Sequence, residues 1–137
     1  MIKKYLIIFS VLIILPSNLF SKNQYFQEGV NLFKNNKFNE AKFKFEQDIV
    51  FNPKNEISYL YLSKIFKEQG DTNQQETNLN TVLLINPKNE EALYNLILLR
   101  VEQSNISESE NLLKNFEKIC DKLCTKLSEL KIKIKQI

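Results

Sequence analysis

Hydrophobic residues recur along most of the chain with the period of an α-helix. Between residues 24 and 52 they follow spacings of three and four, which predicts two amphipathic helices broken by the polar stretch 34–37. The same alternation of helix and polar break continues through residues 56–87 and 92–119, and a last apolar stripe with lysines opposite lies within 123–137. Glycine and proline are scarce. We therefore expect an all-α protein.

The first twenty residues follow a different pattern. Lys3 and Lys4 precede an unbroken apolar run over residues 5–15, and small or polar residues follow up to Ser21. A basic start, a short apolar run and a small residue are typical of a secretory signal, which we predict to cover residues 1–21. Leu19 is larger than a signal peptidase prefers, so an uncleaved N-terminal anchor, and with it a membrane tether, stays an alternative. We expect export to a bacterial periplasm or cell envelope, with secretion also open.

A five-residue phrase occurs twice and divides the remaining chain. Asn-Pro-Lys-Asn-Glu stands at residues 52–56 and again at 86–90, an offset of 34 residues. Proline has no N–H and disfavours the α conformation of the residue before it, so one helix must end there and the next can begin. An identical phrase at a fixed offset is the mark of a repeat array. The phrase therefore predicts two joints between stacked units.

The residues between these joints resemble the tetratricopeptide repeat, a helix-turn-helix unit of 34 residues. In the first unit the family's aromatic, small and large positions, and its closing proline, are occupied by Tyr25, Gly29, Leu32, Ala41, Phe45 and Pro53. The resemblance is weaker in the second unit and weakest in the third, which lacks the closing proline. It implies a short α-solenoid with units at about 22–55, 56–89 and 90–123 in a domain spanning 22–137, closed by a capping helix at about 123–137. One departure is Asp48, at a place where the family usually has alanine; we expect either a rotated helix there or an aspartate that reaches the surface.

Composition excludes several kinds of chemistry. The chain has no histidine, which removes histidine-based catalysis and metal ligation, and it has no glycine-rich phosphate loop. Removing Lys3 and Lys4 lowers the formal net charge from +3 to +1, too little for general nucleic-acid binding. Carboxylate pairs such as Glu90 and Glu91 fall at predicted helix starts, where they stabilise the helix dipole. We expect no enzyme activity, no cofactor and no metal.

Cys120 and Cys124 are the only cysteines, and two interpretations of them stay open. If the repeat register holds, Cys120 closes one helix and Cys124 opens the next, so a disulfide would staple the joint that lacks proline. If a single helix runs through both, they lie a turn apart in a poor geometry for a bridge, and free thiols are expected. An exported protein permits the disulfide.

The resemblance also implies a binding surface. In this family the first helices of successive units line a groove that holds a segment of a partner protein. The matching positions in this chain are Phe26, Val30, Phe33, Leu60, Lys64, Lys67, Tyr94, Leu98 and Val101. Aromatic and long apolar groups with two lysines suit an amphipathic or partly acidic segment. For Tyr94, Leu98 and Val101, coverage by the terminal helix or by a second copy of the chain is an equal alternative, because their helix is apolar almost all round.

Two functions are consistent with this pattern. The first is a non-catalytic interaction scaffold of the cell envelope or periplasm that binds a peptide or helix of another protein in the groove. The second is a structural subunit that docks permanently in an envelope complex, or self-associates, through its apolar third unit and last helix. A repeat fold alone does not name a partner.

Overall fold

The computed structural model describes residues 24–136, which form an all-helical array without strands in that range. The predicted signal segment, residues 1–21, lies outside the described residues. The helices are α2 (Gln24–Lys34), α3 (Phe38–Phe51), α4 (Glu56–Glu68), α5 (Thr72–Ile85), α6 (Glu90–Glu102), α7 (Ile106–Ile119) and α8 (Leu127–Lys135), with a 3-10 turn, η3 (Cys124–Lys126), before the last.

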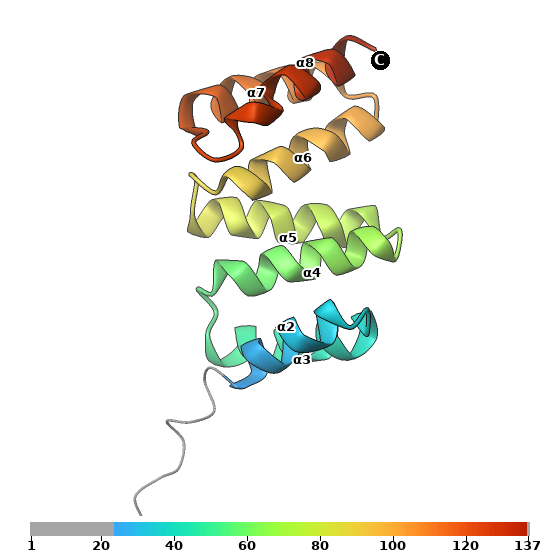
Figure 1. Ribbon diagram of the computed structural model, residues 1–137, viewed down its shortest axis with the longest axis vertical. Coiled ribbons are helices and arrows are strands. Elements are labelled where there is room, and N and C mark those ends of the chain that lie inside the picture. The colour runs from blue at the N-terminus through green and yellow to red at the C-terminus, as the bar shows by residue number, and fades with distance from the viewer. Residues whose placement is uncertain (1–23, 137) are drawn as a thin grey trace, which may run out of the picture.

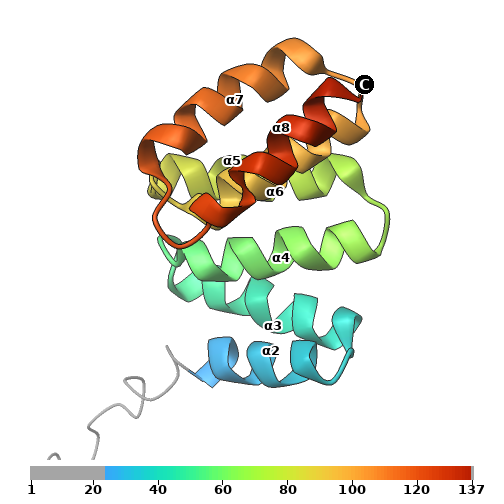
Figure 2. The same ribbon diagram turned by 45° about the horizontal axis from the view of Figure 1, so that its top comes forward.

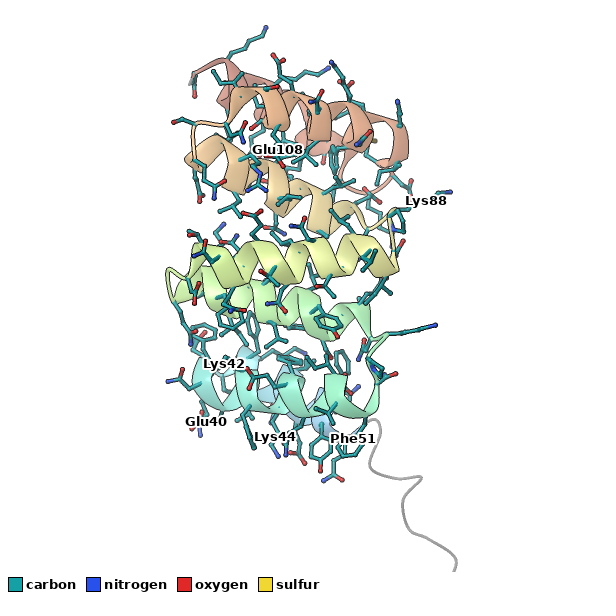
Figure 3. The ribbon with its side chains drawn as sticks, turned by 180° about the vertical axis from the view of Figure 1, so that it is seen from behind. Glu40, Lys42, Lys44, Phe51, Lys88 and Glu108 are labelled. Carbon is teal, nitrogen blue, oxygen red and sulfur yellow. A yellow bond between two sulfur atoms is a disulfide. The ribbon has the colours of Figure 1, made fainter. Side chains whose placement is uncertain are left out.

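The helices stack one above another along the long axis of the molecule (Figure 1). The first helices of the units, α2, α4 and α6, form one layer together with α8. The second helices, α3, α5 and α7, form another layer, which faces the viewer in Figure 3. All connections between units lie on one side of the stack, and all turns within units lie on the other (Figure 1). We call these sides the joint edge (residues 52–55, 86–89 and 120–126) and the turn edge (residues 35–37, 69–71 and 103–105).

Each turn within a unit contains one residue with left-handed backbone. These residues are Asn36 (φ 58°), Gly70 (φ 72°) and Ser104 (φ 54°), spaced by one repeat length. The N–H that follows each of them donates to the carbonyl five residues earlier, at 2.9 to 3.0 Å. This hydrogen bond satisfies a free carbonyl at the helix end, which is why helices often finish this way. Only Gly70 is the residue type that adopts this conformation without strain.

Both copies of the repeated phrase form joints, as predicted. α3 ends at Phe51 and α5 at Ile85, and the asparagine that follows each helix donates its N–H back to the helix at 2.7 and 2.8 Å. The proline then stops any further helical hydrogen bonding. In the second copy the side chain of Asn89 caps α6 by accepting the N–H of Ala92 at 2.9 Å.

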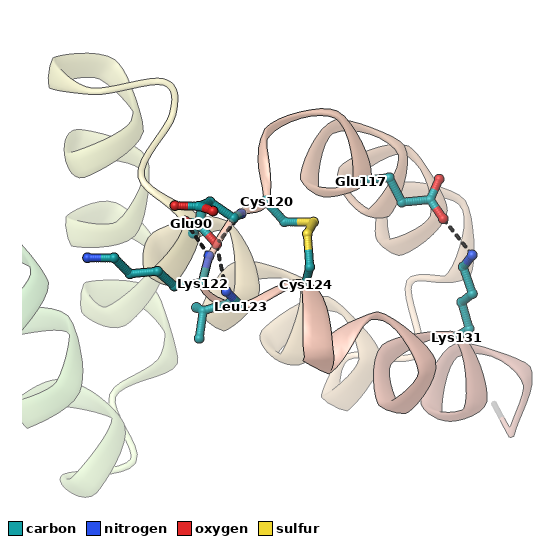
Figure 4. Close-up of a disulfide and its surroundings, with 8 residues drawn as sticks. Glu90, Glu117, Cys120, Lys122, Leu123, Cys124 and Lys131 are labelled. Atoms are coloured by element: carbon teal, nitrogen blue, oxygen red, sulfur yellow. Dashed lines mark hydrogen bonds and ion pairs between the residues drawn. A yellow bond between two sulfur atoms is a disulfide. The ribbon is translucent and has the colours of Figure 1, made fainter.

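The glutamate of each phrase binds the next joint. Glu56 Oε1 accepts hydrogen bonds from the side-chain amides of Asn86 (2.9 Å) and Asn89 (3.2 Å). Glu90 accepts the backbone N–H groups of residues 121, 122 and 123 at 2.9, 3.4 and 2.8 Å (Figure 4). These N–H groups hold the pKa of the Glu90 carboxyl below its usual value. Each glutamate therefore links joints that are about one repeat apart.

A disulfide closes the third joint, where proline is missing. Cys120 follows the last residue of α7, Cys124 opens η3, and their sulfur atoms are bonded, with 5.1 Å between the two Cα atoms (Figure 4). The helix thus stops at Ile119 and does not run through both cysteines. The bridge lies directly beside the backbone groups that Glu90 binds.

Apolar residues form three clusters that follow one another along the stack. The first unit meets the second through Ala41, Phe45, Leu62 and Ile65. The second meets the third through Leu60, Leu79, Val82, Ala92, Leu96 and Leu99. The third meets α8 through Leu93, Ile97, Leu113, Phe116, Leu130 and Ile134. Such nearest-neighbour burial is what stabilises a repeat array.

Asp48 is fully buried, contrary to both expectations for it. Its side chain is 0% exposed, and Oδ2 accepts hydrogen bonds from Ser58 Oγ (2.6 Å) and Asn55 Nδ2 (2.7 Å). One repeat later the same two core positions hold Val82 and Ala92, both also fully buried. The interface between the first and second units therefore has a polar pair at the two positions where the interface between the second and third units has an apolar pair.

Arg100 joins three helices at the turn edge. Its guanidinium binds both carboxylate oxygens of Glu76, at 2.6 and 2.7 Å, and Nε lies 2.8 Å from Glu108 Oε2. Hydrogen bonds to these carboxylates raise the pKa of Arg100 and lower the pKa of Glu76. Arg100 is buried, where an unpaired charge would be unfavourable, and the bidentate contact with Glu76 compensates its guanidinium charge.

Candidate functional site

The layer of first helices carries an open pocket of about 520 Å³ at the start of α6. Its lining comes from the first two turns of α6 and from the disulfide-closed joint: Glu90, Glu91, Tyr94, Asn95, Lys122 and Leu123. We call the surface formed by α2, α4 and the first half of α6, including this pocket, the first-helix face. Figure 4 shows Lys122 and Leu123 extending from the joint beside Glu90.

An ion pair connects the pocket with α4. Lys64 Nζ lies 2.6 Å from Glu91 Oε1, and the same ammonium lies 5.2 Å from the centre of the Tyr61 ring. Tyr61 in turn contacts the edge of Phe33 at 5.0 Å between ring centres. An aromatic and charged strip therefore crosses from α2 over α4 to α6.

The predicted groove residues of the first unit lie partly under this strip. Phe26 and Phe33 pack against Tyr61, and Val30 packs with them against the first core cluster, so all three are half-buried. Lys67 on α4 is exposed.

The prediction that Leu60 lines the groove is wrong. Leu60 is only 4% exposed and belongs to the core between the second and third units. Successive helical residues are turned by about 100°, so Leu60 and its neighbour Tyr61 face different surroundings. Tyr61 takes the place on the first-helix face that was assigned to Leu60.

The predicted groove residues of the third unit lie against α8. Tyr94, Leu98 and Val101 pack on the cluster that contains Leu130 and Ile134 of α8. Figure 2 shows α8 in front of α6, and the two helices are in contact. The terminal helix therefore covers this part of the first-helix layer.

Tyr94 marks the border between the covered and the open surface. Its hydroxyl donates to Glu129 of α8 at 3.3 Å, while the residue also lines the open pocket. Burial, and next the neighbouring Glu129 carboxylate, raise the pKa of the Tyr94 hydroxyl. Beyond it, the half-buried Leu98 and Val101 line a smaller hollow of about 280 Å³ together with Glu102, Lys133 and Gln136.

The sequence pattern did not indicate four residues of the first-helix face: Tyr61, Glu91, Asn95 and Lys122. Three of them could have been found from helical spacing. Tyr61 precedes Lys64 by three residues, and Glu91 and Asn95 precede Leu98 by seven and three, so each shares a face with a predicted groove residue. Lys122 had no such signal, because its position depends on how the third joint folds.

Few groups of the pocket are free to bind a ligand. Lys64 neutralises Glu91, and three N–H groups occupy Glu90. Among residues 24–136, no carboxylate lies within ion-pair distance of Lys122. The pocket thus offers one ammonium, the apolar surfaces of Tyr94 and Leu123, and the Oδ1 of Asn95, whose Nδ2 already donates to the Glu91 carbonyl at 2.8 Å.

Two further searches bear on the kind of site. In the part of the chain that the structure describes, no group of three or more acidic, cysteine or histidine side chains is placed to hold a metal ion. Within the same residues no helix combines the length and hydrophobicity needed to cross a membrane.

Comparison with known proteins gives matches at the level of structure. No protein-family profile matches the chain, and no curated protein sequence does. The TPR2B domain of yeast Sti1, solved with a pHsp70 partner, superposes with a TM-score of 0.77 at 12% identity, covering 84% of this chain and 96% of that one.

Two further neighbours come from a bacterium and from human. The Yersinia enterocolitica type III secretion chaperone SycD, solved with a peptide of the translocator YopD, has a TM-score of 0.76 at 15% identity and covers 90% of this chain and 97% of its own. The second TPR domain of human RPAP3, solved with an HSP70 peptide, has a TM-score of 0.66 at 15% identity, covering 80% and 94%. These similarities establish the fold: residues 24–136 form a short α-solenoid of tetratricopeptide-repeat type.

Proposed function

We propose that this protein is a non-catalytic scaffold that binds a segment of another protein on its first-helix face. The observation that carries the proposal is the open pocket at the start of α6, where apolar walls, an amide and the Lys122 ammonium meet on one surface. Solved neighbours of the same fold, the yeast Sti1 domain and Yersinia SycD, are complexes with segments of other proteins. The fold and the pocket together favour a peptide-binding role over a catalytic one.

The properties of the surface favour a short amphipathic segment. The strip over Tyr61 and Tyr94 provides aromatic area, which contributes strongly to protein interfaces. Lys67 on α4 and Lys122 at the third joint add positive charge, because neither has a carboxylate partner among residues 24–136. An amphipathic segment with some acidic residues would match this distribution.

We place this activity in the cell envelope or periplasm of a bacterium. The support is the sequence of residues 1–21, with its basic start and short apolar run. The disulfide between Cys120 and Cys124 is consistent with an oxidising compartment.

The structural-subunit alternative has less support. It uses the apolar third unit and the last helix together as the docking surface, and α8 packs on Tyr94, Leu98 and Val101, which removes part of that surface. In α8 itself, Leu130 and Ile134 are buried in this contact, and Ile132 is the large apolar residue that stays exposed, at 56%.

Capture from an envelope extract tests the proposal. The purified protein is compared with a variant carrying Lys67→Glu and Lys122→Glu, and with a control carrying Lys114→Glu and Lys135→Glu, which changes the same charge at exposed positions away from the first-helix face. We expect the first variant to lose a captured protein that the control retains, with unchanged helicity in both. Equal capture by the two variants would contradict the assignment of this surface.

A further inference from the structure

A second pocket, of about 450 Å³, opens between the end of α5, the start of α6 and the outer side of α7. Its lining consists of Leu83, Pro87, Lys88, Leu93, Leu112, Asn115, Lys118 and Ile119. It lies at the joint edge, where Figure 3 shows Lys88 extending from the connection between α5 and α6. We call it the joint pocket.

Apolar side chains form most of its wall. Leu83, Leu112 and Ile119 are half-buried, so each presents part of its side chain to the pocket, and Leu93 lies beneath them in the core. The site can therefore hold a large apolar group, and its volume is within the range of binding pockets in general, about 300 to 1,000 Å³.

Two lysines flank this apolar wall. Among residues 24–136, no carboxylate lies within ion-pair distance of Lys88 or Lys118. The acidic residues closest to them in sequence are engaged elsewhere: Glu90 binds the third joint, and Glu117 pairs with Lys131 at 2.6 Å. Lys88 and Glu90 lie two residues apart in the sequence, but the fold directs Glu90 to the third joint. The rim of the pocket is therefore positively charged.

We propose that the joint pocket is a second binding site, which takes an acidic segment of a partner protein with a large apolar side chain in the pocket and carboxylates on Lys88 and Lys118. Charge complementarity selects this occupant. Stable attachment to an anionic membrane surface typically uses four to eight clustered basic residues, more than the two present here. Nucleic-acid binding likewise needs a longer basic surface.

The joint pocket is separate from the first-helix face. The two pockets share no lining residue and use different residues of α6: Glu90, Glu91, Tyr94 and Asn95 line the first, and Leu93 lines the second. A partner on one side does not occupy the other, so the scaffold can hold two segments at once.

A labelled peptide tests the site directly. The probe is a fluorescein-labelled Glu-Glu-Leu-Phe-Glu-Glu peptide, and its counterpart has two serines in place of Leu-Phe; binding to the full purified protein is followed by fluorescence anisotropy at low salt. We expect the probe to bind and its serine counterpart to bind much more weakly. Equal binding of the two peptides, or no binding of either, would overturn the proposal.

Two sets of variants locate the binding. Lys88→Gln with Lys118→Gln is expected to weaken the probe roughly fivefold, the effect of losing two exposed ion pairs, while Lys34→Gln with Lys37→Gln at exposed positions on the turn edge leaves it unchanged. Asn115→Trp places a large side chain at the exposed rim and should block the pocket without removing core atoms, whereas Asn115→Gln should not. Unimpaired binding by Asn115→Trp, with helicity intact, would refute the site.

The other possible occupants give distinct results. Vesicles containing phosphatidylglycerol are presented in place of the peptide, and we expect no binding that depends on Lys88 and Lys118. If the vesicles show such binding and the peptide does not bind, the site recognises lipid and the proposal fails. Light scattering that shows self-association abolished by Asn115→Trp would assign the pocket to a second copy of this chain instead.

Discussion

The buried pair Asp48 and Ser58 allows a sharp test of how the units are held together. Their side chains meet at 2.6 Å, and the equivalent positions one unit later, Val82 and Ala92, are apolar and equally buried. The second carboxyl oxygen of Asp48, Oδ1, is buried and accepts no hydrogen bond from the described residues. Replacing the polar pair by Val and Ala therefore gives these two core positions the residues that they have at the next unit interface.

The single changes should each destabilise the protein. Ser58→Ala removes a hydrogen bond to a buried carboxyl group and should cost about 1.5 to 3 kcal/mol. Asp48→Val leaves the fully buried Ser58 hydroxyl without its acceptor and removes one of the two acceptors of the Asn55 amide, at a cost of about 1 to 3 kcal/mol. The double variant removes both partners of the buried hydrogen bond together. Only the half-buried Asn55 amide, which donates to both side chains in the wild type, loses its acceptors, and it can be hydrated. We expect its stability to lie within about 1 kcal/mol of the wild type, or above it.

Urea unfolding of the four proteins, followed by circular dichroism, measures these differences. With a denaturant slope of about 1 to 3 kcal/mol per molar urea, a change of 2 kcal/mol moves the midpoint by roughly 1 M. The double-mutant cycle then gives the coupling between the two sites. If the cost of the double variant equals the sum of the two single costs, the argument that the pair acts as one buried unit is refuted.

Three further predictions concern single residues. Ser104→Gly should raise the free energy of unfolding by about 0.5 to 1 kcal/mol by relieving left-handed backbone strain, as read from thermal unfolding. Glu90→Gln should flatten the acid side of the stability profile: because the folded pKa of Glu90 lies below its unfolded value near 4.5, its contribution is complete above that pH and is lost as the pH falls through the folded pKa. Gly29→Ala should destabilise by about 1 to 3 kcal/mol in urea, because the added Cβ would lie 2.9 Å from the Phe45 ring.

Each of these has a control or a contrary outcome. Gln103→Gly, next to Ser104 but with φ of −81°, should destabilise, so a gain from both changes would point away from strain relief. If the melting temperatures of the wild type and of Glu90→Gln differ by the same amount at every pH between about 3 and 7, Glu90 does not contribute to the pH dependence of stability, contrary to the prediction. A stabilising Gly29→Ala would mean that the Phe45 ring yields and that helix propensity decides the outcome.

The regular part of the fold follows from local sequence. Pro53 and Pro87 end helices through their own covalent structure, so the amino-acid sequence alone is enough to place the joints. The breaks within the units can likewise be placed at Asn36, Gly70 and Ser104 from their polar or flexible surroundings. The left-handed backbone at Asn36 and Ser104 is less apparent, because only Gly70 is a residue type that signals it.

The hydrogen-bond partners of polar side chains cannot be inferred from local sequence in the same way. Glu56 and Glu90 stand at helix starts, where a favourable interaction with the helix dipole is sufficient to explain them. Their actual partners lie about 30 residues away, and only the stacking of units brings those groups together. Asp48 illustrates the same limit, because its two donors come from beyond the end of its own helix, at the start of the next unit.

The candidate site was predicted at the level of the helix and less well at the level of the side chain. The predicted groove and the larger pocket share the layer of first helices, although only Tyr94 belongs to both sets of residues. Assigning Leu60 and not Tyr61 to the surface reflects a rotation of one residue, which is enough to exchange a core position for a more accessible one. The joint pocket had no sequence signal, because its wall comes from three helices and one connection.

The position of α8 sets the length of segment that the first-helix face can accept. Because Leu98 and Val101 pack against α8, the first-helix face extends over α2, α4 and the first half of α6. Packed helices are spaced by about 8 to 10 Å, so three of them present roughly 20 Å from the first axis to the last. An extended chain advances about 3.3 Å per residue and would therefore be gripped over only about six residues. Recognition on that scale selects short linear motifs that many unrelated proteins can carry.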